Sequence, residues 1–260
     1  MRELPTLFIS HGAPTLAIDD GPTARFLREL GTMLPRPRAI LCASAHWATS
    51  APQASDAIDP ETIHDFSGFG GVLDEFTYPA PGDPVLAQRA VDLLRAAGFA
   101  GAATAARGFD HGAWVPLSLM YPDAEVAVVQ VSLQPRLGPA HHLALGRALR
   151  PLRDEGVLVI GSGSASHNLG ELAGGSAQPP GWMTAFDDWL TAAVGEGREA
   201  DLIAYRALAP HAERNHPSDE HLLPLFVAMG AGDGGPGRLV HAAVTFGVLS
   251  MACFAFAGDR

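Results

Sequence analysis

Several runs of apolar residues occur along the chain and predict strands that are buried on both faces of a sheet. They cover residues 4–10, 39–45, 126–133 and 157–162, and residues 244–254 form either a strand pair or one long strand. Segments in which apolar residues recur at helical spacing separate most of these runs. This alternation predicts an α/β protein whose central sheet is covered by helices on both faces.

The predicted helices are bounded by residues that commonly start or stop a helix. Pro84 stands in the first turn of one segment and Gly98 comes just past its end, which predicts a helix over residues 84–97. The other predicted helices cover residues 23–34, 141–155, 182–194, 200–208 and 221–229, and one more leads from a turn at 108–114 to Met120.

Three stretches lack a regular pattern. Residues 51–81 are rich in Asp, Gly and Pro, and a loop of this length inside a compact domain usually has a function. An irregular region that contains Gly174 and Gly175 follows Asn168, and the Gly-rich residues 230–237 are predicted to form a turn.

Composition favours one well-packed domain. Hydrophobic residues make up 47% of the 260 residues and charged residues only 17%, which suffices for a large core and excludes a disordered chain. No linker-like or low-complexity segment divides the sequence. We therefore expect a single domain over residues 1–260.

The charge and the cysteines limit the partners and the compartment. A net charge of −11 without clustered basic residues argues against a nucleic-acid partner. Cys42 and Cys253 both lie in apolar segments, so a disulfide framework is not expected. The N-terminal segment lacks a secretory pattern, and no apolar run approaches the roughly 20 residues that span a bilayer. These features predict a cytoplasmic protein without membrane contact.

Histidines follow three of the predicted strands. His11 and His46 come directly after apolar runs, and His167 follows a turn rich in Ser, Gly and Ala after the run at 157–162. His221 stands just ahead of a predicted helix. Ligand and catalytic groups gather at the carboxyl ends of strands in open α/β sheets, and imidazole is the commonest nitrogen ligand for zinc and iron. The pattern predicts one mononuclear metal site.

The neighbours of these histidines leave several roles open. Glu220 makes the segment at His221 a source of a nitrogen ligand, a carboxylate ligand or a carboxylate that orients a ligand. His111 follows Asp110, which could orient its ring as a proton carrier or satisfy it as an ordinary turn histidine. His64 is a weaker candidate for substrate contact. Four further histidines are expected to be solvated or structural: His141, His142, His211 and His241.

Other catalytic patterns fit less well. Residues 161–165 have two glycines around a serine but lack the last glycine of a Gly-x-Ser-x-Gly elbow. Neither a Walker-type phosphate loop nor a His-Glu-x-x-His helix occurs. A zinc-dependent hydrolase and a non-enzymatic metal-binding interaction protein stay open as alternatives, because a histidine-rich site suits both.

Seven ordered motifs resemble those of class III extradiol ring-cleaving dioxygenases of the DOPA-dioxygenase type, in the LigB-like superfamily. The similarity runs from about residue 5 to residue 253. The motifs are Ser10-His11-Gly12-Ala13-Pro14, Ser44-Ala45-His46-Trp47, Thr62-Ile63-His64-Asp65-Phe66, Tyr78-Pro79-Ala80-Pro81-Gly82, Gly108-Phe109-Asp110-His111-Gly112, Ser166-His167-Asn168-Leu169 and Glu220-His221-Leu222-Leu223-Pro224-Leu225.

The resemblance implies a single catalytic α/β domain with a central mixed, mostly buried β-sheet flanked by helices. It implies that His11, His46 and His221 bind one divalent metal ion, that His167 is a further ligand or the acid/base, and that His111 is a substrate-facing or ligand-supporting histidine. Fe(II) is expected for activity, although zinc could occupy the site in a purified sample.

The implied activity is the O2-dependent opening of the aromatic ring of a DOPA-like catechol to a muconic semialdehyde. The expected partners are a small aromatic diol and O2, and the expected assembly is a monomer or small homo-oligomer. Aromatic residues near the motifs are candidate walls of the substrate site: Trp47, Phe66, Phe69 and Tyr78.

Overall fold

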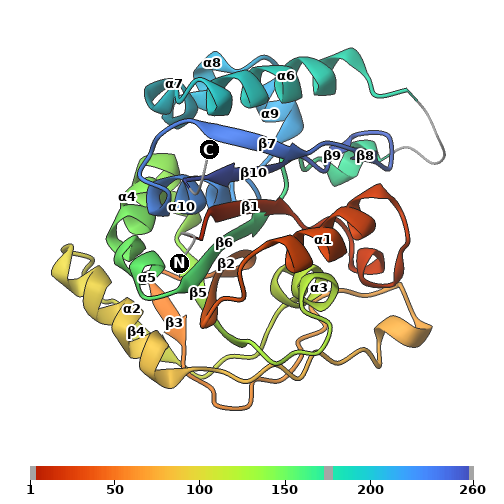
Figure 1. The fold of residues 1–260 in the computed structure, drawn as a ribbon. Helices are drawn as coiled ribbons and strands as arrows, with labels where there is room; N and C mark the ends of the chain where they lie inside the picture. The colour runs from red at the N-terminus through yellow and green to blue at the C-terminus, as the bar shows by residue number, and fades with distance from the viewer. Residues whose placement is uncertain (1–3, 173–177, 258–260) are drawn as a thin grey trace.

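A mixed eight-stranded sheet forms the centre of the computed structural model within its described residues, 4–172 and 178–257 (Figure 1). The strand order is β4-β3-β5-β2-β6-β1-β10-β7, and β5, β2, β6 and β1 run parallel. The strands span Thr6–Ser10 (β1), Ala39–Ala48 (β2), Gln53–Ser55 (β3), Ala103–Ala105 (β4), Ala127–Leu133 (β5), Val157–Gly163 (β6), Gly237–His241 (β7) and Cys253–Phe256 (β10). A separate hairpin pairs Val244–Thr245 (β8) with Leu249–Ser250 (β9).

Helices cover both faces of this sheet because the central strands are apolar on both sides. Along β1, Phe8 belongs to one buried cluster, and Leu7 and Ile9 belong to the other. The face of Phe8 is covered by α2 (Pro84–Ala96), α4 (Gly138–Leu149), α6 (Gly181–Gly195) and α10 (Leu223–Ala231), and the opposite face by α1 (Pro22–Met33) and α3 (His111–Met120). The shorter helices are α5 (Pro151–Asp154), α7 (Glu199–Ile203), α8 (Tyr205–Leu208) and α9 (Ala212–Asn215), with 3-10 turns at Pro14–Ile18 (η1), Gly71–Leu73 (η2), Pro135–Leu137 (η3) and Leu169–Glu171 (η4).

The predicted α/β fold is confirmed, and the four predicted inner strands occur close to their predicted bounds. The predicted helix over 141–155 starts earlier and divides at Pro151, which has no N–H to continue the helical hydrogen bonds. The segment 200–208 forms the two short helices α7 and α8 instead of one.

Some elements were not predicted. The 51–81 loop contains β3 and η2, β4 follows α2, and β7 begins at Gly237, where a turn was expected. Strands of three residues such as β3 are too short for alternation to show in a sequence. The final region forms the β8–β9 hairpin and then β10. Gly174 and Gly175, in the irregular region after Asn168, lie outside the described residues.

None of the described helices combines the length and the apolar character that crossing a membrane requires.

Helices α4 and α10 approach each other at two glycines. A Cβ on Gly146 would overlap the carbonyl oxygen of Val227, and a Cβ on Gly230 would overlap the carbonyl oxygen of Leu143. The two backbones therefore touch where these side chains are missing. This contact fixes the position of α10 relative to α4. A Cβ on Gly161 of β6 would likewise overlap the carbonyl oxygen of Pro224, so the start of α10 lies directly on the sheet.

We predict that Gly146→Ala destabilises the protein by about 1–3 kcal/mol, because the added methyl group meets a backbone atom that cannot rotate away. Urea unfolding would measure the loss. Gly195→Ala is the matched control, because Gly195 is an exposed helical position. A Cβ on Gly195 would meet no neighbouring atom of the described residues within 4 Å. Alanine should raise stability there by up to about 1 kcal/mol. Equal effects of the two substitutions would contradict the close approach.

Candidate metal centre

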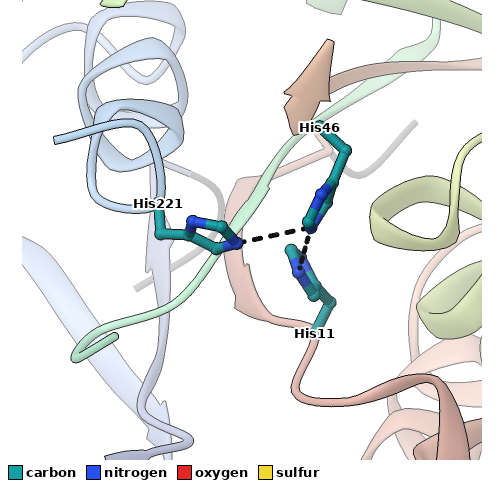
Figure 2. A group of neighbouring side chains, drawn as sticks. All are labelled: His11, His46 and His221. Carbon is teal, nitrogen blue, oxygen red and sulfur yellow. Dashed lines mark hydrogen bonds between the residues drawn. The ribbon is translucent and has the colours of Figure 1, made fainter. Parts of the chain in front are cut away.

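Three histidine side chains point toward one another from separate segments at the carboxyl edge of the parallel strands (Figure 2). His11 directly follows β1, and His221 stands just before α10. His46 lies inside β2, near its end, rather than after the strand as expected, because β2 continues to Ala48. The structure therefore brings together three of the four histidines that the sequence suggested as metal ligands.

The backbone of β6 holds His221 in position. Ser164 N–H donates to the carbonyl oxygen of His221 at 2.8 Å, directly after the strand ends. A Cβ on Gly163 would overlap that same carbonyl oxygen. The segment before α10 therefore lies directly on the end of β6, which is possible only with glycine at this position.

The Nε2 atoms of the three rings are close enough to share one ion. His46 Nε2 lies 3.1 Å from His11 Nε2 and 3.3 Å from His221 Nε2. With metal–nitrogen bonds of about 2.1 Å, two ligand nitrogens are about 3.0 Å apart at right angles and about 3.4 Å apart in a tetrahedron. The observed separations fall between these values.

The Nδ1 atoms all face hydrogen-bond acceptors. His221 Nδ1 lies 2.9 Å from a Glu220 carboxylate oxygen, and His46 Nδ1 lies 3.4 Å from an Asp65 oxygen. His11 Nδ1 lies 3.0 Å from the hydroxyl of Ser162. The hydrogen bond from His221 lowers the pKa of Glu220 to about 2, so its carboxylate is ionised and accepts. His46 and His221, whose Nδ1 atoms face carboxylates, therefore carry their proton on Nδ1, since a neutral imidazole has one N–H and one acceptor nitrogen.

Burial keeps these rings neutral. It lowers the pKa of His46 to about 4 and that of His221 to about 3, and it holds the pKa of His11 well below its usual range. With the single proton on Nδ1, the Nε2 atoms of His46 and His221 present lone pairs. Lone pairs that face each other in a buried space repel unless a cation lies between them. The donor set thus fits one divalent ion held by nitrogen.

His167 lies beside this group and not within it. Its ring stacks on that of His221, with centroids 3.4 Å apart and planes inclined by 9°. Among the described residues, its possible ligand group contains Glu220 and His221 and omits His11 and His46. Burial lowers the pKa of His167, so the ring is neutral near pH 7 and can accept a proton. This position suits proton transfer beside the ion.

Asp65, and not Asp110, orients His111. One Asp65 oxygen lies 2.8 Å from His111 Nδ1 and accepts from the His111 backbone N–H at 3.0 Å, while the other faces His46. Burial raises the pKa of Asp65, but hydrogen bonds from His111 outweigh it and lower the pKa to about 2. The expectation that Asp110 orients His111 is wrong. Asp65 supports two histidines at once, a role that its place beside His64 in the long loop could have suggested.

Asp110 belongs to a buried network behind His46. Its carboxylate accepts from the Ser44 hydroxyl at 2.6 Å, from Gln130 Nε2 at 2.8 Å and from Arg107 Nη2 at 3.2 Å. Arg107 also donates to the carbonyl oxygen of His46 at 3.3 Å. The network fixes the start of α3 against β2, since a fully buried carboxylate requires such partners.

Of the remaining candidates, Phe66 packs beside His111. Its ring is edge-on to His111 at 5.8 Å, and the exposed Phe69 packs on it. The His64 ring nitrogen bonds to the carbonyl oxygen of Phe76, and Tyr78 donates to the carbonyl oxygen of Tyr121. Trp47 is buried beneath the guanidinium of Arg107.

Three of the four histidines that were expected to be solvated or structural make clear structural bonds. His141 Nε2 lies 2.9 Å from the side-chain oxygen of Gln134. His142 is buried, with Nε2 accepting from Gln134 N–H and Nδ1 donating to the carbonyl oxygen of Gly138. His241 lies 2.9 Å from the hydroxyl of Thr23.

A family model described as the catalytic LigB subunit of aromatic ring-opening dioxygenase matches residues 5–257. The chain belongs to this family. Its fold and its class of enzyme, an extradiol aromatic ring-opening dioxygenase, agree with the prediction from the sequence motifs.

Curated relatives carry the same class of activity in their names. The chain is 45% identical to a 4,5-DOPA dioxygenase extradiol of Beta vulgaris, with 96% of each chain covered. It is 40% identical to a protein of that name from Escherichia coli K12, over 89% of this chain and 86% of the relative. The crystal structure of an uncharacterized Escherichia coli K12 protein superposes with a TM-score of 0.82 and 33% identity, covering 98% of this chain and all of the other.

We predict that Asp65→Asn weakens zinc binding about 10–100-fold, because the amide no longer accepts charge-assisted bonds from both His46 and His111. Competition with a chromophoric chelator would measure the affinity. Asp74→Asn, an exposed change in the same loop, is the control and should leave the affinity unchanged. Equal zinc affinities of the two variants would show that Asp65 does not support the metal site.

Proposed function

We propose that the protein opens the ring of a DOPA-like catechol with O2 beside one hydroxyl, giving a muconic semialdehyde, with one divalent iron held by His11, His46 and His221. The observation that carries this proposal is the convergence of three Nε2 atoms in a chain of the ring-opening dioxygenase family: His46 Nε2 lies 3.1 Å from that of His11 and 3.3 Å from that of His221. The names of the curated relatives support the substrate class.

The donor set has the character that the reaction needs. Three protein ligands would leave room on a bound iron for a catechol and O2, and the chemistry that iron would supply there is electron transfer between the two. Asp65 and Glu220 place two negative charges behind the histidine rings, which offset the charge of a divalent ion and make the rings better donors. A third histidine thus takes the place that a carboxylate holds in the common two-histidine site of non-haem iron enzymes.

Proton transfer falls to His167 and His111. His167 is neutral near pH 7, stacks on His221 and can accept the proton that a bound catechol hydroxyl releases. The Nδ1–H of His111 donates a hydrogen bond to Asp65, so Nε2 is the atom of this ring that can exchange a proton with a substrate. Phe66 stands beside His111 as an apolar wall for the ring. The two histidines lie beside different proposed ligands: His167 stacks on His221, and His111 packs beside His46.

The first test is oxygen uptake by anaerobically iron-loaded protein with catechol, DOPA and protocatechuate, together with visible absorbance. We expect uptake with DOPA and a yellow semialdehyde product, and no uptake by zinc-loaded protein. Absence of uptake with all three diols at confirmed iron content would overturn the proposed substrate class. Chelator-sensitive ester or amide hydrolysis in the same sample would indicate a zinc hydrolase instead.

Substitution of the histidines separates ligands from proton carriers. We expect His46→Ala to remove bound metal, because it leaves the other two rings without the nitrogen that lies between them. We expect His167→Ala to lower turnover at least 100-fold while most of the metal stays bound. Metal analysis alongside single-turnover kinetics would measure both effects. Equal loss of metal in the two variants would make His167 an essential ligand.

A further inference from the structure

The three rings of the metal centre are supported unequally. His46 and His221 face the carboxylates of Asp65 and Glu220, whereas His11 faces the neutral hydroxyl of Ser162 at 3.0 Å. An ionised carboxylate only accepts hydrogen bonds and so selects the Nδ1–H form of a ring. A hydroxyl can donate or accept, so by itself it selects neither form. Something else has to decide which nitrogen of His11 carries the proton.

A carbonyl group in the first turn of α3 determines whether the Ser162 hydroxyl donates to His11 or accepts from it. The Ser162 hydroxyl makes a very short hydrogen bond to the carbonyl oxygen of Gly112, and both groups are buried. In an uninterrupted helix this carbonyl would accept from the N–H of residue 116. Residue 116 is proline, inside α3, and has no N–H. The carbonyl of Gly112 is therefore left for the serine.

The position of this carbonyl is fixed by close packing. A Cβ on Gly112 would overlap the Ser44 hydroxyl and would lie 2.9 Å from Cδ2 of His46. The first turn of α3 thus sits directly against β2. Ser162, on β6, pairs with Ile9 of β1, two residues before His11. The sheet holds Ser162 and His11, and helix α3, which packs on the sheet, holds the carbonyl group of Gly112.

We propose that Ser162 is a positioning residue that fixes the protonation pattern of His11, and that Pro116 makes this possible by leaving the Gly112 carbonyl free. With its one proton committed to Gly112, the Ser162 oxygen can only accept from His11 Nδ1–H, and the His11 Nε2 lone pair faces His46 and His221. The inference rests on the proposed function in one respect, that His11 is a metal ligand.

The test uses the zinc-free full-length chain and nitrogen-15 spectra of its histidine side chains. The His11 signals are assigned by their loss in His11→Gln. We expect the Nδ1–H form alone in the wild type and a mixture of both forms in Ser162→Ala. Zinc affinity, measured by chelator competition, should fall about 10–100-fold in Ser162→Ala. Ser132→Ala removes another fully buried strand hydroxyl, which bonds to Thr49 and Gln53, and should change neither measurement.

A second variant separates positioning from simple structural damage. Pro116→Ala supplies an N–H that competes for the Gly112 carbonyl and also removes a proline from a helix interior. We expect the second form of His11 to appear and zinc affinity to fall, while the thermal midpoint does not fall in proportion. This variant decides the matter if Ser162→Ala fails to fold.

An Nε2–H form of His11 in the wild type, or unchanged forms and affinity in both variants, would overturn the inference. The test of this inference and the test of the proposed function can fail separately. A correct His11 pattern and tight zinc binding without oxygen uptake by the iron-loaded protein would contradict the proposed ring cleavage and leave the role of Ser162 intact.

Discussion

Three imidazole nitrogens that all present lone pairs meet at the carboxyl edge of the sheet, and the surrounding structure is arranged to keep them that way. In a buried space this arrangement is unfavourable without a cation, because the low dielectric of the protein interior strengthens the repulsion between lone pairs. Each ring is therefore held from behind by an acceptor: Asp65 for His46, Glu220 for His221 and Ser162 for His11. In metal sites built from histidine, the affinity for the ion depends on such acceptors as well as on the ligands themselves.

The acceptors come from parts of the chain that differ in character. Ser162 lies on an inner strand, Glu220 is the chain neighbour of its own histidine, and Asp65 lies in the long segment between β3 and α2. Asp65 also bonds to the ring and the backbone of His111. The segment that carries Phe66 is thereby tied to both His46 and His111, so the proposed substrate wall and the proposed metal ligand share one supporting residue.

Close backbone approach makes this geometry possible. Gly163 lets the segment before α10 lie on the end of β6, and Gly112 lets α3 start directly against Ser44 and His46. Gly146 and Gly230 bring α4 and α10 into contact behind them. Larger side chains at these positions would move whole elements, since packed backbones do not yield as side chains do. The positions of the three histidines thus depend on glycines, at which no side chain keeps the backbones apart.

The sequence by itself determined the α/β class and the four inner strands, because the pattern of buried strands is local along the chain. It also indicated the histidines at or near the ends of three of these strands as candidates for a site. It also showed through its ordered motifs which family the chain belongs to. Only the tertiary structure decided that Asp65 and not Asp110 orients His111, that His167 stacks on His221, and that Ser162 supports His11. These contacts join residues far apart in the chain, 46 positions for Asp65 and His111 and 151 for His11 and Ser162. The short strands β3, β4 and β7 likewise form because neighbouring strands pair with them. A local sequence pattern does not show which strands will pair, so these three could not be predicted.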